Sequence, residues 1–168
     1  MKKYITNGVL FTHNELVNDA VVVIDGDKIT EVRKKKPNEV FGGEVIDASG
    51  NFITPGFIDI HFHGAMGTDA MDAEFTSLQV MSAFCAAHGV TSFYPTTWSA
   101  AQEDILEAIN CVKEYQHKVK GSQILGVHVE GPYVDLKYRG AQLSSMIRKP
   151  DRSEYQEWFD SGVVKIIT

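Results

Sequence analysis

Two histidines, His61 and His63, stand two residues apart near the end of an apolar run at residues 55–64. Imidazole nitrogens are common ligands of zinc and similar divalent cations. Side chains along a β-strand alternate between its two faces, so residues at i and i+2 point in the same direction. The pair is therefore a candidate for two ligands of one metal site. The alternative is a pair of structural, hydrogen-bonded histidines.

A carboxylate, Glu130, ends a second apolar run, and Gly131 and Pro132 follow it as a turn signal. If both runs are parallel strands of one sheet, their carboxyl ends meet at the same rim, and Glu130 lies near the histidine pair. An inward-facing carboxylate needs a partner, which a shared cation would provide. We therefore expect Glu130 to bind metal, with a solvent-exposed strand end as the alternative.

Three other polar residues near these runs are given structural roles. His128 has the parity of Glu130 but lies deeper in its strand, so we expect a hydrogen-bonded core or supporting residue, with a metal ligand as the alternative. Asp59 lies deeper than His61 and is expected to be a structural hydrogen-bond partner, with support of a metal ligand as the alternative. Asp69 follows the first run and is expected to be a solvated loop carboxylate, with a substrate contact as the alternative.

The elements that would position these residues alternate between strand and helix from residue 55 onward, as in βα units around a parallel sheet. Apolar runs predict strands at residues 56–63, 91–96, 123–130 and 163–168. Apolar residues at helical spacing predict helices at residues 75–88, 101–118 and 152–159. The pattern predicts an α/β fold built on a parallel sheet. In the (β/α)8 TIM-barrel form of such a fold, functional residues lie at the carboxyl ends of the strands.

The first 54 residues differ from the rest, because short β-rich runs alternate there with turn signals. Asp25-Gly26 between two such runs predicts a hairpin. We therefore divide the chain into a small β-module at residues 1–54 and a βα unit at residues 55–168, which carries the candidate metal ligands. A complete barrel needs about 250 residues, so this chain has room for only about four βα units. We expect the first half of a barrel that stops inside a strand. Such a half exposes two parallel strand edges, so it is expected to be unstable and inactive by itself.

Composition limits the partners and the compartment. A formal net charge of −6 argues against nucleic acid or an anionic membrane as the main partner. The sequence has no signal peptide and no apolar run of the roughly 18 residues that a membrane span needs. Cys85 and Cys111 are far apart and predict neither a disulfide framework nor a zinc motif. These features favour a reducing, cytoplasmic setting.

Residues 55–64 resemble the first barrel strand of the amidohydrolase superfamily, and residues 1–54 resemble the β-sandwich that flanks the barrel there. Many members use a carboxylated lysine as the bridging metal ligand. Glu130 followed by Gly131 and Pro132 is instead similar to the N-acetylglucosamine-6-phosphate deacetylases, as is the run at residues 137–142.

This resemblance implies hydrolysis of N-acetyl-D-glucosamine 6-phosphate to D-glucosamine 6-phosphate and acetate. It implies one or two divalent cations per subunit (zinc, iron or manganese), held by Glu130, His61 and His63, and acting as a Lewis acid. The residues that match Ala141 and Gln142 contact the substrate in that family. Two further histidine ligands and the catalytic aspartate are expected beyond Thr168, so no catalytic residue is assigned within this chain.

The resemblance also implies a homodimer when the protein is complete, with a small amino-sugar phosphate as its binding partner. Two alternatives stay open. One is a cyclic-amide hydrolase of the dihydroorotase or hydantoinase type, which usually carries the bridging lysine that this chain lacks. The other is a non-catalytic scaffold, against which the retention of His61, His63 and Glu130 argues.

Overall fold

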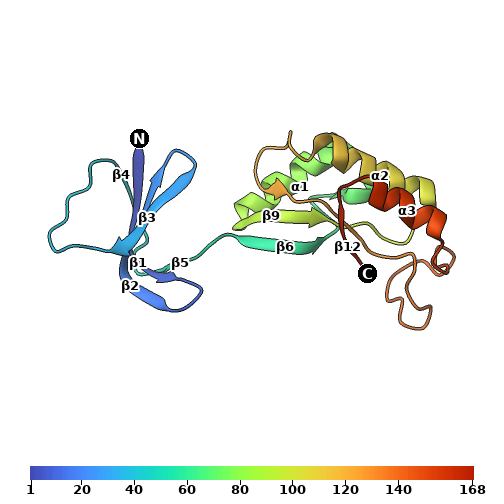
Figure 1. Ribbon diagram of the computed structural model, residues 1–168, viewed down its shortest axis with the longest axis horizontal. Helices are drawn as coiled ribbons and strands as arrows, with labels where there is room; N and C mark the ends of the chain where they lie inside the picture. Colours follow the sequence, from blue (N-terminus) through green and yellow to red (C-terminus); the bar gives the residue numbers. More distant parts are fainter. The chain divides into compact units, whose positions relative to one another are not determined.

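The computed structural model describes residues 1–168, which form two compact units, Met1–Pro55 and Gly56–Thr168 (Figure 1). Each unit has its own cluster of buried apolar side chains. No helix has the length and apolar character needed to cross a membrane.

The first unit is a mixed five-stranded sheet in the order β3-β2-β1-β4, with β5 also paired to β1. Its strands are β1 (Lys2–Phe11), β2 (Leu16–Asp25), β3 (Lys28–Lys34), β4 (Glu44–Asp47) and β5 (Phe52–Ile53). The strands β1, β2 and β3 are antiparallel, and the predicted hairpin is confirmed because Asp25 pairs with Lys28. Leu10, Ala20 and Val22 form the buried centre.

The second unit is built on parallel strands that follow one another along the chain. The strand β9 pairs with β6 and β10, the strand β11 pairs with β12, and a bridge between Thr96 and His128 links the two groups. Their bounds are β6 (Phe57–Phe62), β9 (Val90–Pro95), β10 (Gln123–Ile124), β11 (Val127–Val129) and β12 (Val164–Ile167). This arrangement brings the carboxyl ends of β6, β9 and β11 to one rim.

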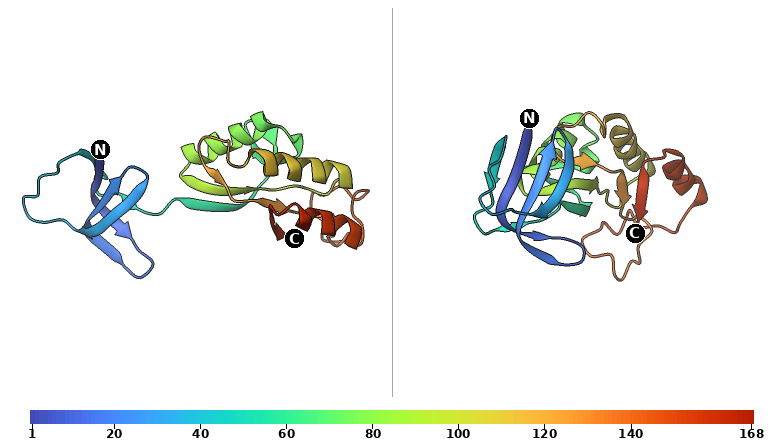
Figure 2. Two further views of the ribbon diagram at one scale, coloured as in Figure 1. Left: turned by 45° about the horizontal axis from the view of Figure 1, so that its top comes forward. Right: turned by 60° about the vertical axis from the view of Figure 1, so that its left-hand side comes forward.

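Three helices connect these strands: α1 (Phe75–Ala87), α2 (Gln102–Tyr115) and α3 (Arg152–Asp160). Figures 1 and 2 show α1 and α2 side by side along β6 and β9. Leu78, Met81, Phe93, Ile105 and Ile109 are fully buried in the core beneath them. Burial of each such side chain contributes about 1.5–3 kcal/mol to the free energy of folding. The apolar faces of α1 and α2 therefore stabilise their packing against the sheet.

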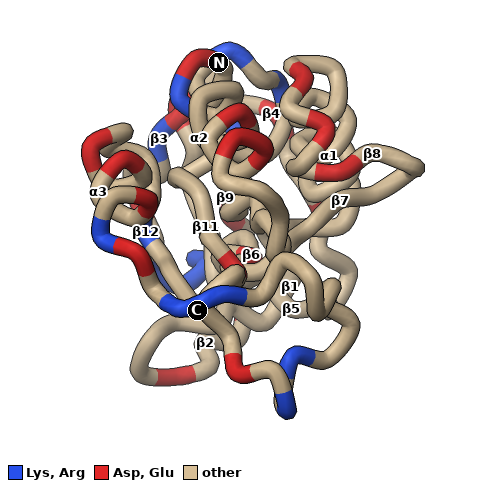
Figure 3. Tube along the Cα trace, turned by 90° about the vertical axis from the view of Figure 1, so that its right-hand side faces the viewer, with Lys and Arg blue, Asp and Glu red and all other residues tan.

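Helix ends are stabilised by charge and by capping. Figure 3 shows acidic residues along α2 and α3. Glu103 and Asp104 lie in the first turn of α2, where the helix dipole favours negative charge. Asp151 caps α3 by accepting a hydrogen bond of 2.9 Å from the backbone N–H of Ser153. This hydrogen bond satisfies one backbone N–H at the start of α3.

One predicted strand, at residues 123–130, is interrupted in the structure. Gly126 separates β10 from β11 and has a φ of 144°. A Cβ at this position would stand within 2.4 Å of the carbonyl oxygen of Val163. The close approach of β12 therefore requires a glycine and breaks the strand, which apolar patterning does not reveal.

A small hairpin after β6 was not predicted. Its strands are β7 (Gly64–Ala65) and β8 (Thr68–Asp69), followed by the short helix η1 (Ala70–Asp72). Asp69 accepts a hydrogen bond of 2.8 Å from the backbone N–H of Met71 and so caps η1. The carboxylate is used by the local fold, which is a different role from the solvated loop carboxylate expected from the sequence.

Candidate metal centre

His61, His63 and Glu130 converge at the rim formed by the ends of β6 and β11. The Nε2 atoms of the two histidines lie 3.1 Å apart. The Oε2 atom of Glu130 lies 2.9 Å from Nε2 of His61 and 3.0 Å from Nε2 of His63. Among the 168 residues, this is the one group of three or more His, Cys, Asp or Glu residues with the geometry to hold a metal ion. The shared direction of the two histidines agrees with period-2 alternation.

The protein fixes the orientation of His63. Its Nδ1 lies 3.0 Å from the carbonyl oxygen of Thr96, at the end of β9. A carbonyl only accepts hydrogen bonds, so Nδ1 carries the proton and donates it. In the neutral ring, Nε2 then presents its lone pair to Glu130 and His61. A ligand histidine whose other nitrogen binds a backbone carbonyl is the usual arrangement in metal sites.

The three side chains fit a divalent cation. Metal–ligand bonds of about 2.1 Å, with angles between 90° and 109°, separate neighbouring ligand atoms by about 3.0–3.4 Å. The observed separations are 2.9–3.1 Å. Without a proton or a cation, two ring lone pairs and a carboxylate oxygen would repel one another at this distance. A shared cation removes that repulsion, and both imidazole and carboxylate are suitable donors.

His128 lies beside this group without joining it. Nδ1 donates to the carbonyl oxygen of Ile60 at 2.8 Å, and Nε2 lies 2.6 Å from the hydroxyl of Thr168. The side chain is buried, and burial lowers its pKa, which favours the neutral ring. Its ring stands edge-on to that of His61 at 4.9 Å between centroids. His128 therefore supports His61 by packing, with both of its own nitrogens hydrogen-bonded.

Asp59 accepts a hydrogen bond of 3.0 Å from the backbone N–H of His61. It is not a member of the metal-binding group. Its carboxylate acts on the backbone of the strand that carries the ligand histidine.

A cavity of about 390 Å³ adjoins His63. Its other lining residues come from the loop after β9 and from the loop between β11 and α3: Trp98, Ser99, Ala141, Gln142 and Leu143. The structure therefore brings Ala141 and Gln142, which the resemblance implies contact a substrate, to the same cavity as His63. Sequence reasoning missed Trp98, Ser99 and Leu143. The position of Trp98 just after the carboxyl end of β9 was the one available signal.

The two loops are joined at this cavity. The Oε1 atom of Gln142 accepts a hydrogen bond of 2.6 Å from the backbone N–H of Ser99. Gly131, directly after Glu130, has a φ of 71°, and a Cβ there would stand 2.2 Å from the Ser99 hydroxyl oxygen. The glycine therefore permits both the left-handed turn and the close approach that brings Glu130 to the rim.

Comparisons with known proteins found one matching family model and several similar proteins. Residues 52–167 match the sequence model of the amidohydrolase family. An N-acetylglucosamine-6-phosphate deacetylase of Bacillus subtilis is 34% identical over 165 residues, covering 95% of this chain and 42% of the relative. The enzyme of the same name from Haemophilus influenzae is 35% identical over 150 residues, covering 89% of this chain and 39% of the relative.

A solved structure extends the likeness to the fold. The crystal structure of N-acetylglucosamine-6-phosphate deacetylase from Pasteurella multocida aligns with a TM-score of 0.89 at 27% identity, over 99% of this chain and 44% of that chain. The chain therefore spans less than half the length of each of these three relatives.

Proposed function

This chain belongs to the amidohydrolase family, and we propose that it carries the metal-binding part of a deacetylase that hydrolyses N-acetyl-D-glucosamine 6-phosphate to D-glucosamine 6-phosphate and acetate. One observation carries the proposal. The convergence of His61, His63 and Glu130 occurs in a chain that is 34% identical, over 95% of its length, to a deacetylase of that name. The fold is the mixed α/β fold of the family.

His61, His63 and Glu130 are assigned as ligands of one or two divalent cations, with zinc, iron and manganese as the candidates. A bound cation supplies a Lewis acid for the amide carbonyl. The chain's own residues set its position: Thr96 holds the ring of His63 through Nδ1, and Glu130 brings a negative charge to the end of β11. Together they hold the imidazole of His63 and one carboxylate beside Nε2 of His61.

The cavity beside His63 is assigned to the substrate. A volume of about 390 Å³ lies within the usual range for small-molecule sites, roughly 300–1,000 Å³. Trp98 and Leu143 offer apolar walls, and Gln142 keeps its amide NH2 group for a polar contact because its Oε1 already accepts from Ser99. Ala141 and Gln142 are the proposed substrate contacts.

The surrounding architecture is assigned by the same reasoning. The parallel strands β6, β9, β10 with β11, and β12 correspond to the first four strands of a (β/α)8 barrel, within residues 55–168. Residues 1–54 are assigned to a flanking β-sandwich. A homodimer in the cytoplasm completes the proposal, and two buried, unpaired cysteines support a reducing compartment.

Two other functions fit less well. A cyclic-amide hydrolase would account for a histidine pair, but the relatives that match over most of this chain are named as deacetylases of an amino-sugar phosphate. A scaffold without catalysis would not need three ligand atoms within 3.1 Å of one another.

The test is acetate release by the complete gene product, loaded in turn with zinc, iron or manganese. We expect turnover of N-acetyl-D-glucosamine 6-phosphate, loss of turnover with a chelator, and recovery on adding metal back. Dihydrouracil serves as the cyclic-amide comparison and is expected not to react. Turnover of dihydrouracil with no release of acetate would reject the deacetylase assignment.

A further inference from the structure

The loop between β11 and α3 has no helix or strand of its own, yet it supplies Ala141, Gln142 and Leu143 to the cavity wall. Long loops of this kind are usually functional or disordered. Most hydrogen bonds within the loop close short turns. For example, the backbone N–H of Tyr138 donates to the carbonyl oxygen of Asp135 at 3.0 Å. Because these turns are local, contacts between the loop and residues outside it must hold the loop in place.

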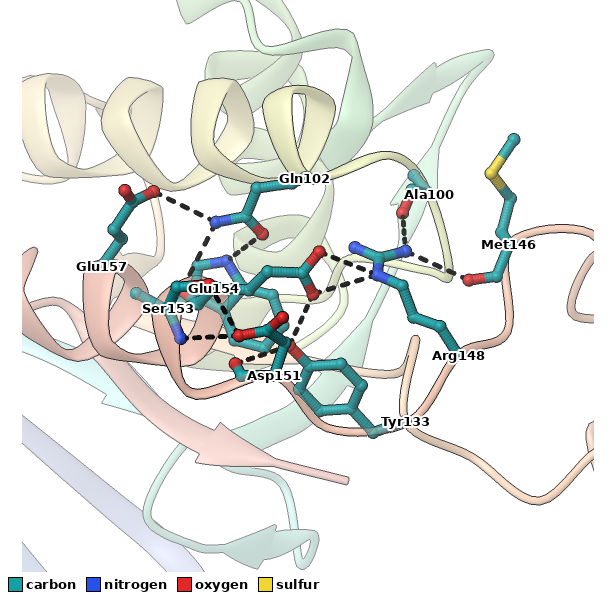
Figure 4. Close-up of polar contacts among 10 residues, drawn as sticks. Ala100, Gln102, Tyr133, Met146, Arg148, Asp151, Ser153, Glu154 and Glu157 are labelled. Atoms are coloured by element: carbon teal, nitrogen blue, oxygen red, sulfur yellow. Dashed lines mark hydrogen bonds and ion pairs between the residues drawn. The ribbon is translucent and has the colours of Figure 1, made fainter.

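Arg148 joins the two ends of this loop and ties them to the rest of the unit (Figure 4). Its backbone N–H donates to the carbonyl of Pro132 at 3.2 Å, which closes the loop at its base. Its Nη1 donates to the carbonyls of Ala100 at 2.8 Å and Met146 at 3.1 Å. Its Nε donates to both carboxylate oxygens of Glu154 at 3.0 and 2.9 Å.

The partner carboxylate is itself fixed. Glu154 lies in the first turn of α3, and its Oε2 also accepts from the hydroxyl of Tyr133 at 2.6 Å. Figure 4 shows Tyr133 and Arg148 approaching Glu154 from different parts of the loop. The exposed fractions of the Arg148 and Glu154 side chains are 28% and 19%, so solvent screens this pair less than a fully exposed one.

The contacts of Arg148 and the wall of the cavity involve the same segment, the loop after β9. Ala100 is bound by the guanidinium at the base of the loop, and Ser99 is bound by Gln142 at the cavity. Trp98 and Ser99 form one side of the cavity, and Gln142 forms another. A shift of Arg148 would change the separation of these walls without touching His61, His63 or Glu130.

We propose that Arg148, paired with Glu154, is a positioning residue that holds the loop after β11 against the loop after β9 and thereby sets the affinity of the cavity for the amino-sugar phosphate. This inference rests on the proposed function for its ligand. A lysine cannot replace Arg148, because one ammonium group does not reach Glu154 and the Ala100 carbonyl in the divergent directions that Nε and Nη1 provide.

If Arg148 served only the stability of the fold, a variant that regained stability would also regain the wild-type KM. Replacing a partly buried ion pair by apolar side chains of similar size often leaves stability unchanged. Arg148 also keeps Nη2 buried without a hydrogen-bond partner, which is an uncompensated desolvation cost that an apolar residue would remove. The double variant Arg148→Met with Glu154→Leu therefore separates stability from positioning.

The experiment compares Arg148→Met, Arg148→Lys and the double variant in the complete gene product, measuring thermal stability, metal content, kcat and KM for N-acetyl-D-glucosamine 6-phosphate. We expect KM to rise about tenfold in all three, a loss of about 1.4 kcal/mol of binding, with metal content unchanged and kcat within about threefold. The double variant is expected to regain only part of the stability that Arg148→Met loses, because Glu154 is no longer left unpaired while Tyr133, Ala100 and Met146 still lack their partners. Its KM is expected to stay raised. Lys118→Met, which removes an exposed pair with Glu114, is the matched control and should change nothing.

Recovery of both stability and KM in the double variant would show that the pair serves the fold alone. A wild-type KM in every variant would overturn the proposal as well. Amide hydrogen exchange gives a readout that needs no substrate, and we expect faster exchange at residues 139–143 in Arg148→Met and in the double variant. If the wild type shows no deacetylase turnover, the proposed function fails, while unchanged exchange in the variants would reject the positioning role.

Discussion

The Nε2 atoms of His61 and His63 lie 3.1 Å apart, yet only one of the two rings is fixed by a backbone carbonyl. His63 donates through Nδ1 to Thr96, whereas His61 rests against the ring of His128. The two candidate ligands are therefore held by different means, and their contributions to metal binding should differ.

We predict that His63→Ala weakens zinc binding more than His61→Ala does. A ligand oriented in advance loses less freedom on binding, and partners that orient ligands are typically worth 10–100-fold in metal affinity. Competition with a chromophoric chelator measures both constants. His117→Ala, on a histidine outside the site, is the control. A larger loss of zinc affinity in His61→Ala would show that the Thr96 contact does not decide which histidine contributes more to zinc binding.

Glu130→Gln should lose metal and activity together. The substitution keeps the shape of the side chain but removes the negative charge that lies 2.9 and 3.0 Å from the two imidazole nitrogens. We expect at least a tenfold loss of metal affinity, judged against the 10–100-fold typical even for residues that only support a ligand. Metal content after dialysis provides the measurement, with Glu107→Gln on α2 as control. Unchanged metal content and rate would remove Glu130 from the ligand set.

The 168-residue chain alone should bind a cation but release no acetate from N-acetyl-D-glucosamine 6-phosphate. Its three converging groups are all assigned as ligands, and no further carboxylate joins them to act on the substrate. The assay compares the purified chain with a blank that contains only metal. Turnover above that blank would mean that a catalytic group within the chain has been overlooked.

Gly131→Ala should destabilise the protein more than Gly162→Ala. Both glycines have positive φ, 71° and 79°, so both variants carry a backbone strain of about 1–2 kcal/mol. At Gly131 the new methyl group would also stand 2.2 Å from the Ser99 hydroxyl, whereas nothing lies within 4 Å at Gly162. Urea unfolding of the two variants isolates the cost of that contact, and equal losses would contradict the prediction.

Cys85 and Cys111 should resist alkylation in the folded protein. Burial raises the pKa of each thiol from 9.0 to about 11. Little thiolate then forms at pH 8, and iodoacetamide should react much faster after unfolding in urea. In the unfolded chain the thiols lose their protons near pH 9, so between pH 9 and 11 the folded state binds more protons and stability falls as pH rises. Fast alkylation of the folded protein would indicate that the thiols are open to solvent.

The convergence of His61, His63 and Glu130 was predictable because it depends on two local rules. Alternation along a strand gives each side chain its direction, and parallel strands place their carboxyl ends at one rim. Neither rule requires knowledge of distant contacts. The helices α1, α2 and α3 followed from apolar spacing for the same reason, with ends that differ from expectation by a few residues at most.

The features that sequence reasoning missed depend on contacts between distant residues. The break at Gly126 is imposed by Val163, and the bond from Ser99 to Gln142 joins loops whose paths no local pattern specifies. Asp69 was missed for a different reason: its cap is a local contact, but the helix it caps is too short to produce a periodic signal. The candidate metal ligands could therefore be named from the sequence, as could Ala141 and Gln142 through the resemblance, whereas the cavity-lining residues Trp98, Ser99 and Leu143 could not.

The parallel strands of Gly56–Thr168 lie beside one another in their order along the chain. The strand β9 pairs with β6, β10 pairs with β9, and β12 pairs with β11. A nascent chain can dock each strand and its helix on the unit synthesised just before, without waiting for a distant segment. Domains generally form in this amino-to-carboxyl direction during translation. The strand that carries His61 and His63 would then fold first. Glu130 would come close to these histidines only after β9 had paired with β6.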